Sequence, residues 1–286
     1  LTLILSIFLL LFLSNTAFCL NPLRSLTQYK QTVWTTDNGL PSDSVMEIVQ
    51  DGNGFIWIGS YEGLIRFDGE NFKVISKYTN PDFDGITARI LHLDNDSNLW
   101  IGTNGSGVSK KSGDTFKMFT THEGLPNNSI RKIFQDKEGN VWVGTTGGLG
   151  VLASGSDVFK PVEKFKNSLI ELIYQDSKGR VWVGPGDGGV FKLEGNRFES
   201  PESFQIMKGK VLLSMNEDNE GNLWMGTKDH GLFILRGDKL VSMGEREGIN
   251  AKSINSIWKG LYNSIWIGTD SGLFRFFRGE FSHYSE

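Results

Sequence analysis

A tryptophan followed two residues later by a glycine recurs at a nearly constant interval along this chain. Six of the eight tryptophans stand 43, 42, 40, 42 and 42 residues apart, in the pairs Trp57–Gly59, Trp100–Gly102, Trp142–Gly144, Trp182–Gly184, Trp224–Gly226 and Trp266–Gly268. An Asp stands six residues before the tryptophan in the first five units, at Asp51, Asp94, Asp136, Asp176 and Asp218. A period of this length indicates a repeat architecture.

Each unit reads as four short strands separated by turns. In the first unit, residues 44–50, 55–59, 63–67 and 71–76 are apolar or alternate between apolar and polar, and Asp, Gly and Asn lie between them. No segment carries a helical period. Four strands per unit of about 40–45 residues are typical of a β-propeller, in which each unit is one blade.

The sequence therefore predicts an all-β fold, a propeller of four-stranded blades over residues 20–286. Six repeats are seen, as a six-bladed ring or as part of a seven-bladed one, with blades near 37–79, 80–121, 122–163, 164–204, 205–246 and 247–286. The repeated residues are interpreted as scaffold: Asp and Gly form the hairpin turn, Trp fills the space between blades, and the Gly after it lets the neighbouring sheet approach.

The ends of the chain raise the question of how the ring closes. Residues 33–45 repeat residues 118–130, so residues 29–35 are predicted to form an outer strand before the first full blade. The sixth blade has an outer strand of its own at 279–285. Two hypotheses follow: the chain is a fragment of a longer protein with a seventh blade, or it is a six-bladed ring whose end strands compete.

The first residues suggest export. The first thirteen residues are apolar apart from Thr2 and Ser6 and lead into SNTAFC. Residues 1–19 are therefore predicted to be a signal peptide cleaved after Cys19, with an uncleaved anchor or a lipoprotein acylated on Cys19 as alternatives. The protein is then periplasmic or secreted. A net charge of −4 without basic runs gives no reason to expect nucleic acid as a partner.

Candidate binding residues lie in the loops after the second strands. These loops differ from blade to blade, whereas the hairpin turns on the other face repeat almost verbatim, and variable loops on a fixed scaffold are where binding surfaces form. Their carboxylate, amide, aromatic and cationic groups would surround the mouth of the central channel and suit a small polar ligand. The predicted ligand-binding residues are Tyr61, Glu62, Asn104, Asp187, Lys228, Asp229, His230 and Asp270.

No catalytic residue, metal site or cofactor is predicted. His92, His122, His230 and His283 lie in different blades without shared spacing, which favours neither a zinc site nor a catalytic triad. Residues 94–98 begin like a calcium loop, but Gly105 stands where the bidentate Glu belongs. Two alternatives stay open: a propeller lyase or hydrolase, with His and carboxylates converging in the channel, and a protein-interaction propeller, with an exposed apolar patch.

Several stretches resemble the two-component regulator propeller repeats. The resemblance is carried by GLPSDSVMEIVQDGNGFIWIGSYEGLIRF, GLPNNSIRKIFQDKEGNVWVGTTGGLGV and IWIGTDSGLFRF, although GLP itself occurs only at 39–41 and 124–126. It implies a periplasmic sensor region of a membrane receptor whose histidine kinase or diguanylate cyclase lies outside this chain, so that the chain itself is not an enzyme. It further implies an oligosaccharide as ligand, and a dimer mate or further receptor domains as partners.

Overall fold

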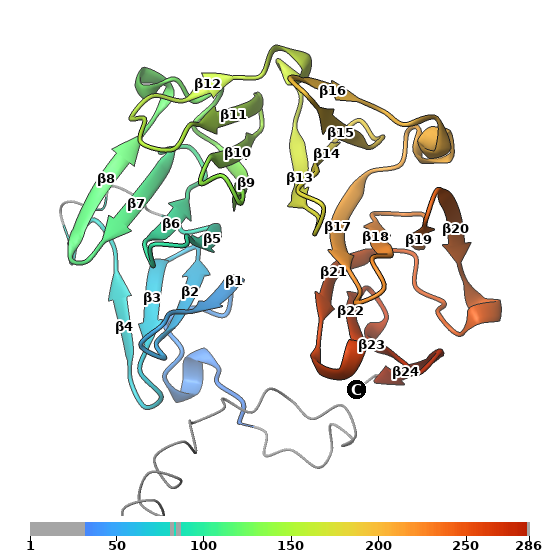
Figure 1. Cartoon of the computed structure of the whole chain (residues 1–286). Coiled ribbons are helices and arrows are strands. Elements are labelled where there is room, and N and C mark those ends of the chain that lie inside the picture. The colour runs from blue at the N-terminus through green and yellow to red at the C-terminus, as the bar shows by residue number, and fades with distance from the viewer. Residues whose placement is uncertain (1–31, 81–82, 84–86, 285–286) are drawn as a thin grey trace, which may run out of the picture.

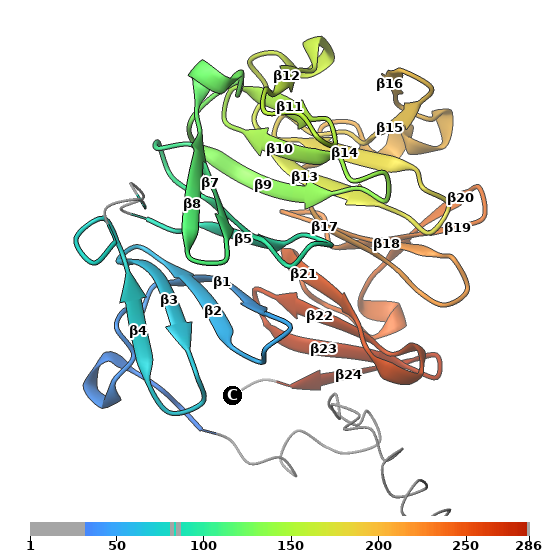
Figure 2. The same ribbon diagram turned by 60° about the vertical axis from the view of Figure 1, so that its left-hand side comes forward.

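The computed structural model describes residues 32–80, 83 and 87–284, so the predicted signal peptide lies outside the described residues. Six four-stranded sheets follow one another around a central axis, and in each the strands are antiparallel neighbours in chain order (Figures 1 and 2). The predicted all-β propeller of four-stranded blades is confirmed, with six blades. No helix in the described part of the chain is long and apolar enough to cross a membrane.

The strands of the first three blades have the following bounds. They are β1 (Val45–Gln50), β2 (Ile56–Ser60), β3 (Gly63–Phe67) and β4 (Phe72–Ile75), then β5 (Ile90–Leu93), β6 (Leu99–Gly102), β7 (Val108–Ser112) and β8 (Thr115–Phe119), then β9 (Ile130–Gln135), β10 (Val141–Thr145), β11 (Gly148–Leu152) and β12 (Lys160–Pro161).

The last three blades repeat the pattern. They are β13 (Ile170–Gln175), β14 (Val181–Pro185), β15 (Phe191–Glu194) and β16 (Arg197–Glu199), then β17 (Leu212–Glu217), β18 (Leu223–Thr227), β19 (Leu232–Arg236) and β20 (Lys239–Met243), then β21 (Ile254–Lys259), β22 (Ile265–Thr269), β23 (Gly272–Phe277) and β24 (Glu280–Tyr284). Short 3₁₀ turns lie between strands: η2 (Thr36–Asn38), η3 (Thr121–Glu123), η4 (Glu163–Phe165), η5 (Glu202–Met207), η6 (Glu245–Glu247) and η7 (Leu261–Asn263).

The repeated Asp does more than form a turn. One oxygen of Asp136 accepts hydrogen bonds from the backbone N–H groups of Glu138 and Asn140, which closes the hairpin, and the other accepts from Trp142 Nε1 at 2.7 Å. The same Asp–Trp bond measures 2.7–2.9 Å in the first five blades, at Asp51–Trp57, Asp94–Trp100, Asp136–Trp142, Asp176–Trp182 and Asp218–Trp224.

The core lies between blades, where the repeated tryptophan of each of the first five blades contacts the next sheet. Trp182 packs with Leu212, Met215 and Met225 of the fifth blade in one buried cluster. The glycine after the tryptophan leaves room for this contact, because a Cβ on Gly102 would lie 2.6 Å from Cγ2 of Ile130, which begins the next inner strand. A larger residue there would force the two sheets apart.

The hairpin turn of one blade is also bonded to the inner strand of the next. The Asn95 N–H donates to Gln135 Oε1 at 2.8 Å, and the Lys137 N–H donates to Gln175 Oε1 at 2.8 Å. Gln50 holds the equivalent position on the first blade, where β1 has no blade before it in chain order.

The first blade leaves one face uncovered within the described residues. Ile48 is 58% exposed, whereas Leu91, Ile133, Ile173, Met215 and Ile257 at the same register position are 2–6% exposed.

The predicted outer strand at 29–35 is not seen in the described part. Residues 32–35 form no strand, and residues 29–31 lie outside the described range. Trp34 instead packs edge-on against Phe67 at 5.1 Å between ring centroids and against Phe72 at 6.2 Å. The predicted outer strand of the sixth blade is present as β24.

Candidate functional site at the channel mouth

The loops between second and third strands bring the predicted binding residues to one face of the propeller, here called the variable face. All of them are exposed. Tyr61 and Asn104 line one small crevice together with Thr87 and Arg89, so these two are brought together. No hydrogen bond or ion pair between described side chains joins the remaining predicted residues, which are Glu62, Asp187, Lys228, Asp229, His230 and Asp270.

A register shift near the start of the inner strands places further side chains at this face. In β9, Ile130 pairs with Thr145 and Lys132 with Gly144, so that Arg131 is skipped. A bulge of this kind re-aims the skipped side chain. With the equivalent residue before β5, the skipped positions form a set that we call the mouth ring: Met46, Arg89, Arg131, Glu171, Leu213 and Asn255.

Two members of the mouth ring, Arg89 and Arg131, are neighbouring arginines. Burial lowers the pKa of Arg89, and the positive charge of Arg131 lowers it further, while Tyr61 and Glu171 oppose the shift. Neither guanidinium forms an ion pair with a described residue, and Arg131 Nε is buried without a hydrogen-bond partner among them. Sequence reasoning missed this pair, although both arginines stand two residues before the apolar residue that the inner strands share.

Titratable groups also line the central channel, a cavity of about 320 Å³ bounded by inner-strand residues of all six blades. Burial raises the pKa of Glu47, although the charge of Lys132 and a hydrogen bond from the Leu91 backbone lower it. Burial likewise raises the pKa of Tyr174, with Glu217 and Asp176 adding to the shift. The channel therefore favours uncharged forms of these side chains.

His92 is held neutral in this channel. Its Nε2 accepts a hydrogen bond from the Gln135 N–H at 3.1 Å, so the ring proton resides on Nδ1. Burial, and then the charge of Lys132, lower the pKa of His92 to about 4, although Asp94 opposes this. The other histidines lie elsewhere: His122 in η3, His230 in an exposed loop, and His283 on β24 with Nε2 2.7 Å from the Ser271 carbonyl oxygen.

The described residues hold no group of three or more His, Cys, Asp or Glu that could bind a metal ion. Of the four histidines, His92 lines the central channel, where the carboxyl group of Glu47 also lies.

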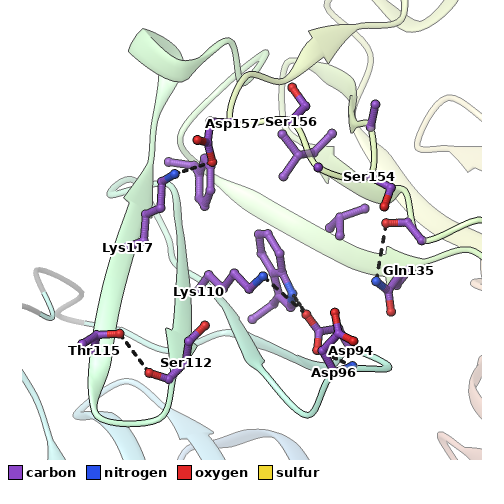
Figure 3. A pocket seen from close by; sticks show the side chains of 17 residues that line it. Asp94, Asp96, Lys110, Ser112, Thr115, Lys117, Gln135, Ser154, Ser156 and Asp157 are labelled. Carbon is purple, nitrogen blue, oxygen red and sulfur yellow. Dashed lines mark hydrogen bonds and ion pairs between the residues drawn. The ribbon is translucent and has the colours of Figure 1, made fainter.

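A second hollow lies between the second and third blades, with a volume of about 420 Å³ (Figure 3). Lys110 lies over the Trp100 ring and 3.8 Å from Asp94, and Lys117 forms an ion pair with Asp157 across the hollow. A similar hollow of about 280 Å³ lies beside Asp218 and Trp224, between the fifth and sixth blades. Because the hollow recurs beside the Asp–Trp pair, we attribute it to the repeat geometry.

Three segments of the chain match the family model described as Two component regulator propeller, at residues 39–62, 124–147 and 206–229. Histidine kinase P4 of Formosa agariphila is 30% identical over 142 residues, which cover 44% of this chain and 10% of that protein.

Solved structures share the fold. The extracellular domain assigned to a hybrid two component system of B. thetaiotaomicron superposes with a TM-score of 0.58 at 23% identity, over 87% of this chain and 39% of that one. Virginiamycin B lyase from Staphylococcus aureus superposes with a TM-score of 0.65 at 13% identity, over 85% of this chain and 84% of that one. Since both receptor and enzyme propellers share this architecture, the fold alone does not separate their functions. The repeat matches identify the sequence type of three segments: residues 39–62, 124–147 and 206–229 each match the two component regulator propeller repeat.

Proposed function

We infer that this propeller is the extracellular, ligand-binding sensor region of a signal-transduction receptor of the two-component or diguanylate cyclase type. The observation that carries the inference is the variable face, where exposed, non-repeating polar loops lie on an otherwise repeating scaffold. The regulator propeller repeats, the histidine kinase relative and the similarly folded extracellular domain support the receptor role.

The ligand is a small polar molecule, and an oligosaccharide fits the site best. Tyr61 is 51% exposed, so its ring can stack on a sugar, while the Asn104 amide and the loop carboxylates can hydrogen-bond hydroxyl groups. A ligand at the mouth would touch several blades at once. It would then favour one packing of the propeller against a dimer mate or further receptor domains, and that population shift is the signal.

The DNA on both sides of this reading frame tests the receptor role. The proposal expects the frame to lead into a membrane-spanning segment and a kinase or cyclase region that supplies the output. A stop codon directly after Glu286, followed by an unrelated gene, would contradict it and would favour a free-standing binding propeller.

A further inference from the structure

We propose that Arg89 and Arg131 bind an oxyanion, a carboxylate, sulfate or phosphate group carried by the ligand that enters the channel mouth. The proposal rests on the ligand-binding role inferred above and adds the chemical class of the ligand. The two arginines stand at the same register position of adjacent blades, two residues before Leu91 and Ile133. The bulge in β9 sets Arg131 at the same end of its strand as Arg89, the two guanidinium charges repel each other, and Arg89 shares a crevice with Tyr61 and Asn104.

The energetics of the pair favour an anion. Each guanidinium raises the free energy of the other, and both are partly withdrawn from water. Glu171 attracts Arg89 but lies beyond ion-pair distance, and Lys132, the residue after Arg131, adds another positive charge along the channel wall. Partly buried like charges without a counter-ion are unfavourable, and a bound oxyanion would relieve that cost.

The donor chemistry also fits. A guanidinium presents a planar set of N–H donors that matches two oxygens of a carboxylate, sulfate or phosphate. Arg131 Nε–H is a buried donor without an acceptor among the described residues, and such donors are rare unless a ligand or water satisfies them.

Neutral polar groups lie next to the arginines. The Asn104 backbone is fixed by an isolated β-bridge to Ser129 and by donation of its N–H to Thr87 Oγ1 at 3.3 Å. Asn104 and Tyr61 can therefore contact the uncharged part of a ligand whose anionic group lies on the arginines. The site thus fits an acidic sugar better than a neutral one.

The test uses probes that share one ring and differ at one carbon: glucose, glucuronate, glucose 6-sulfate and glucose 6-phosphate. Each is titrated into the ¹⁵N-labelled propeller at matched ionic strength, and the Arg131 Nε–H signal, assigned by its loss in Arg131→Gln, is followed. We expect at least one charged probe to shift this signal saturably and glucose to leave it unchanged. Which charged probe binds distinguishes a carboxylated from a sulfated or phosphorylated ligand.

Three variants are compared with the wild type for binding of the charged probe. Arg89→Gln is expected to weaken binding of the charged probe about tenfold or more, because a hydrogen bond to a charged group is lost. Arg131→Lys keeps the charge but not the planar fork and is expected to bind with intermediate strength. Lys178→Gln removes a positive charge from a hairpin turn on the opposite face and is expected to bind as the wild type does. Thermal melts of all variants verify folding.

Two results would overturn the inference. One is the absence of any saturable shift with every charged probe, and the other is equal binding of a charged probe by wild type and Arg89→Gln. If neutral glycans nevertheless bind and Tyr61→Ala abolishes that binding, the sensor role survives and the oxyanion site alone is wrong.

Discussion

At the scale of single residues, the Asp–Trp hydrogen bond explains why the chain repeats one phrase. The carboxylate closes the hairpin with one oxygen and fixes the indole with the other, so the turn and the inter-blade contact are set by the same side chain. The sixth blade lacks this device: Gly260 stands at the Asp position, and Trp266 stacks on Tyr284 at 6.2 Å instead. The sixth blade therefore serves as an internal control for the contribution of the Asp–Trp hydrogen bond to stability.

Replacing Trp142 by Phe should destabilise the protein by about 2 kcal/mol more than replacing Trp266 by Phe, because only the first change removes a hydrogen bond to a buried carboxylate. Urea denaturation monitored by circular dichroism measures both. Equal losses in the two variants would show that the indole N–H contributes little and that ring packing alone matters.

His92 should make stability depend on pH. Its pKa is about 4 in the folded protein and about 6.5 when unfolded, so between these values the unfolded state binds more protons. Its contribution is complete above about pH 6.5 and falls as the pH drops toward 4, by up to about 3 kcal/mol. Glu47, whose pKa is raised, acts in the opposite direction over the window just above its usual value.

Comparing wild type with His92→Gln isolates the histidine, because both retain Glu47 and the Gln side chain can still accept from the Gln135 N–H. Unfolding free energies at about pH 7 and about pH 4.5 should differ more in wild type than in the variant. A variant with the same pH dependence as wild type would mean that the His92 ring is not held neutral.

At the scale of strands and blades, the 42-residue spacing predicts the architecture because every blade must bury the same inter-blade surface. The mouth ring was not predictable in the same way. The bulge places one extra residue between the apolar residues Ile130 and Ile133. Without the strand pairing, the sequence does not show which residue of this strand is the skipped one, so Arg131 could not be recognised as different from its neighbours. The Asp–Trp bond was also missed, because the turn interpretation already accounted for the Asp.

The loop residues, too, could be only partly placed from the sequence. The sequence located Tyr61 and Asn104 on the variable face, where they share a crevice, but it did not reveal that Arg89 lies there as well. Alternation specifies which face of a strand is buried, not how loops of adjacent blades meet.

Gly102 tests the packing between neighbouring blades. Gly102→Ala should cost about 2 kcal/mol or more, because the added Cβ would lie 2.6 Å from Ile130 Cγ2. Gly52→Ala is the matched control, since a Cβ there meets no atom within 4 Å, and its effect should stay within about 0.5 kcal/mol. If thermal melts show Gly102→Ala as stable as Gly52→Ala, the blades are not packed as closely as described.

At the scale of the whole molecule, the first blade presents a surface that elsewhere lies between blades. Ile48 is exposed at a position that is buried in the other five blades. Gln50 stands at the position of Gln135 and Gln175, whose side-chain oxygens accept a hydrogen bond from the hairpin turn of the preceding blade. The hypothesis of a seventh blade predicts that this face is covered in a longer protein.

Replacing the equivalent residues Ile133 and Ile48 by Asp measures whether the face of the first blade is exposed to solvent. Ile133→Asp should unfold the propeller or cost more than about 4 kcal/mol, because it buries a carboxylate between blades. Ile48→Asp should cost less than about 1 kcal/mol in this chain, since Ile48 is 58% exposed. A large loss at Ile48 would mean that another part of the chain already covers the first blade.

The sensor role depends on ligand binding at the variable face, and a glycan array measures this binding directly. The purified propeller is compared with a Tyr61→Ala/Asn104→Ala double variant and with Lys178→Ala on the opposite face. We predict that wild type and Lys178→Ala retain one class of polar glycan, and that the double variant binds it about tenfold or more weakly. Equal retention by all three proteins, or retention of no glycan by the wild type, would contradict the sensor role assigned to this face.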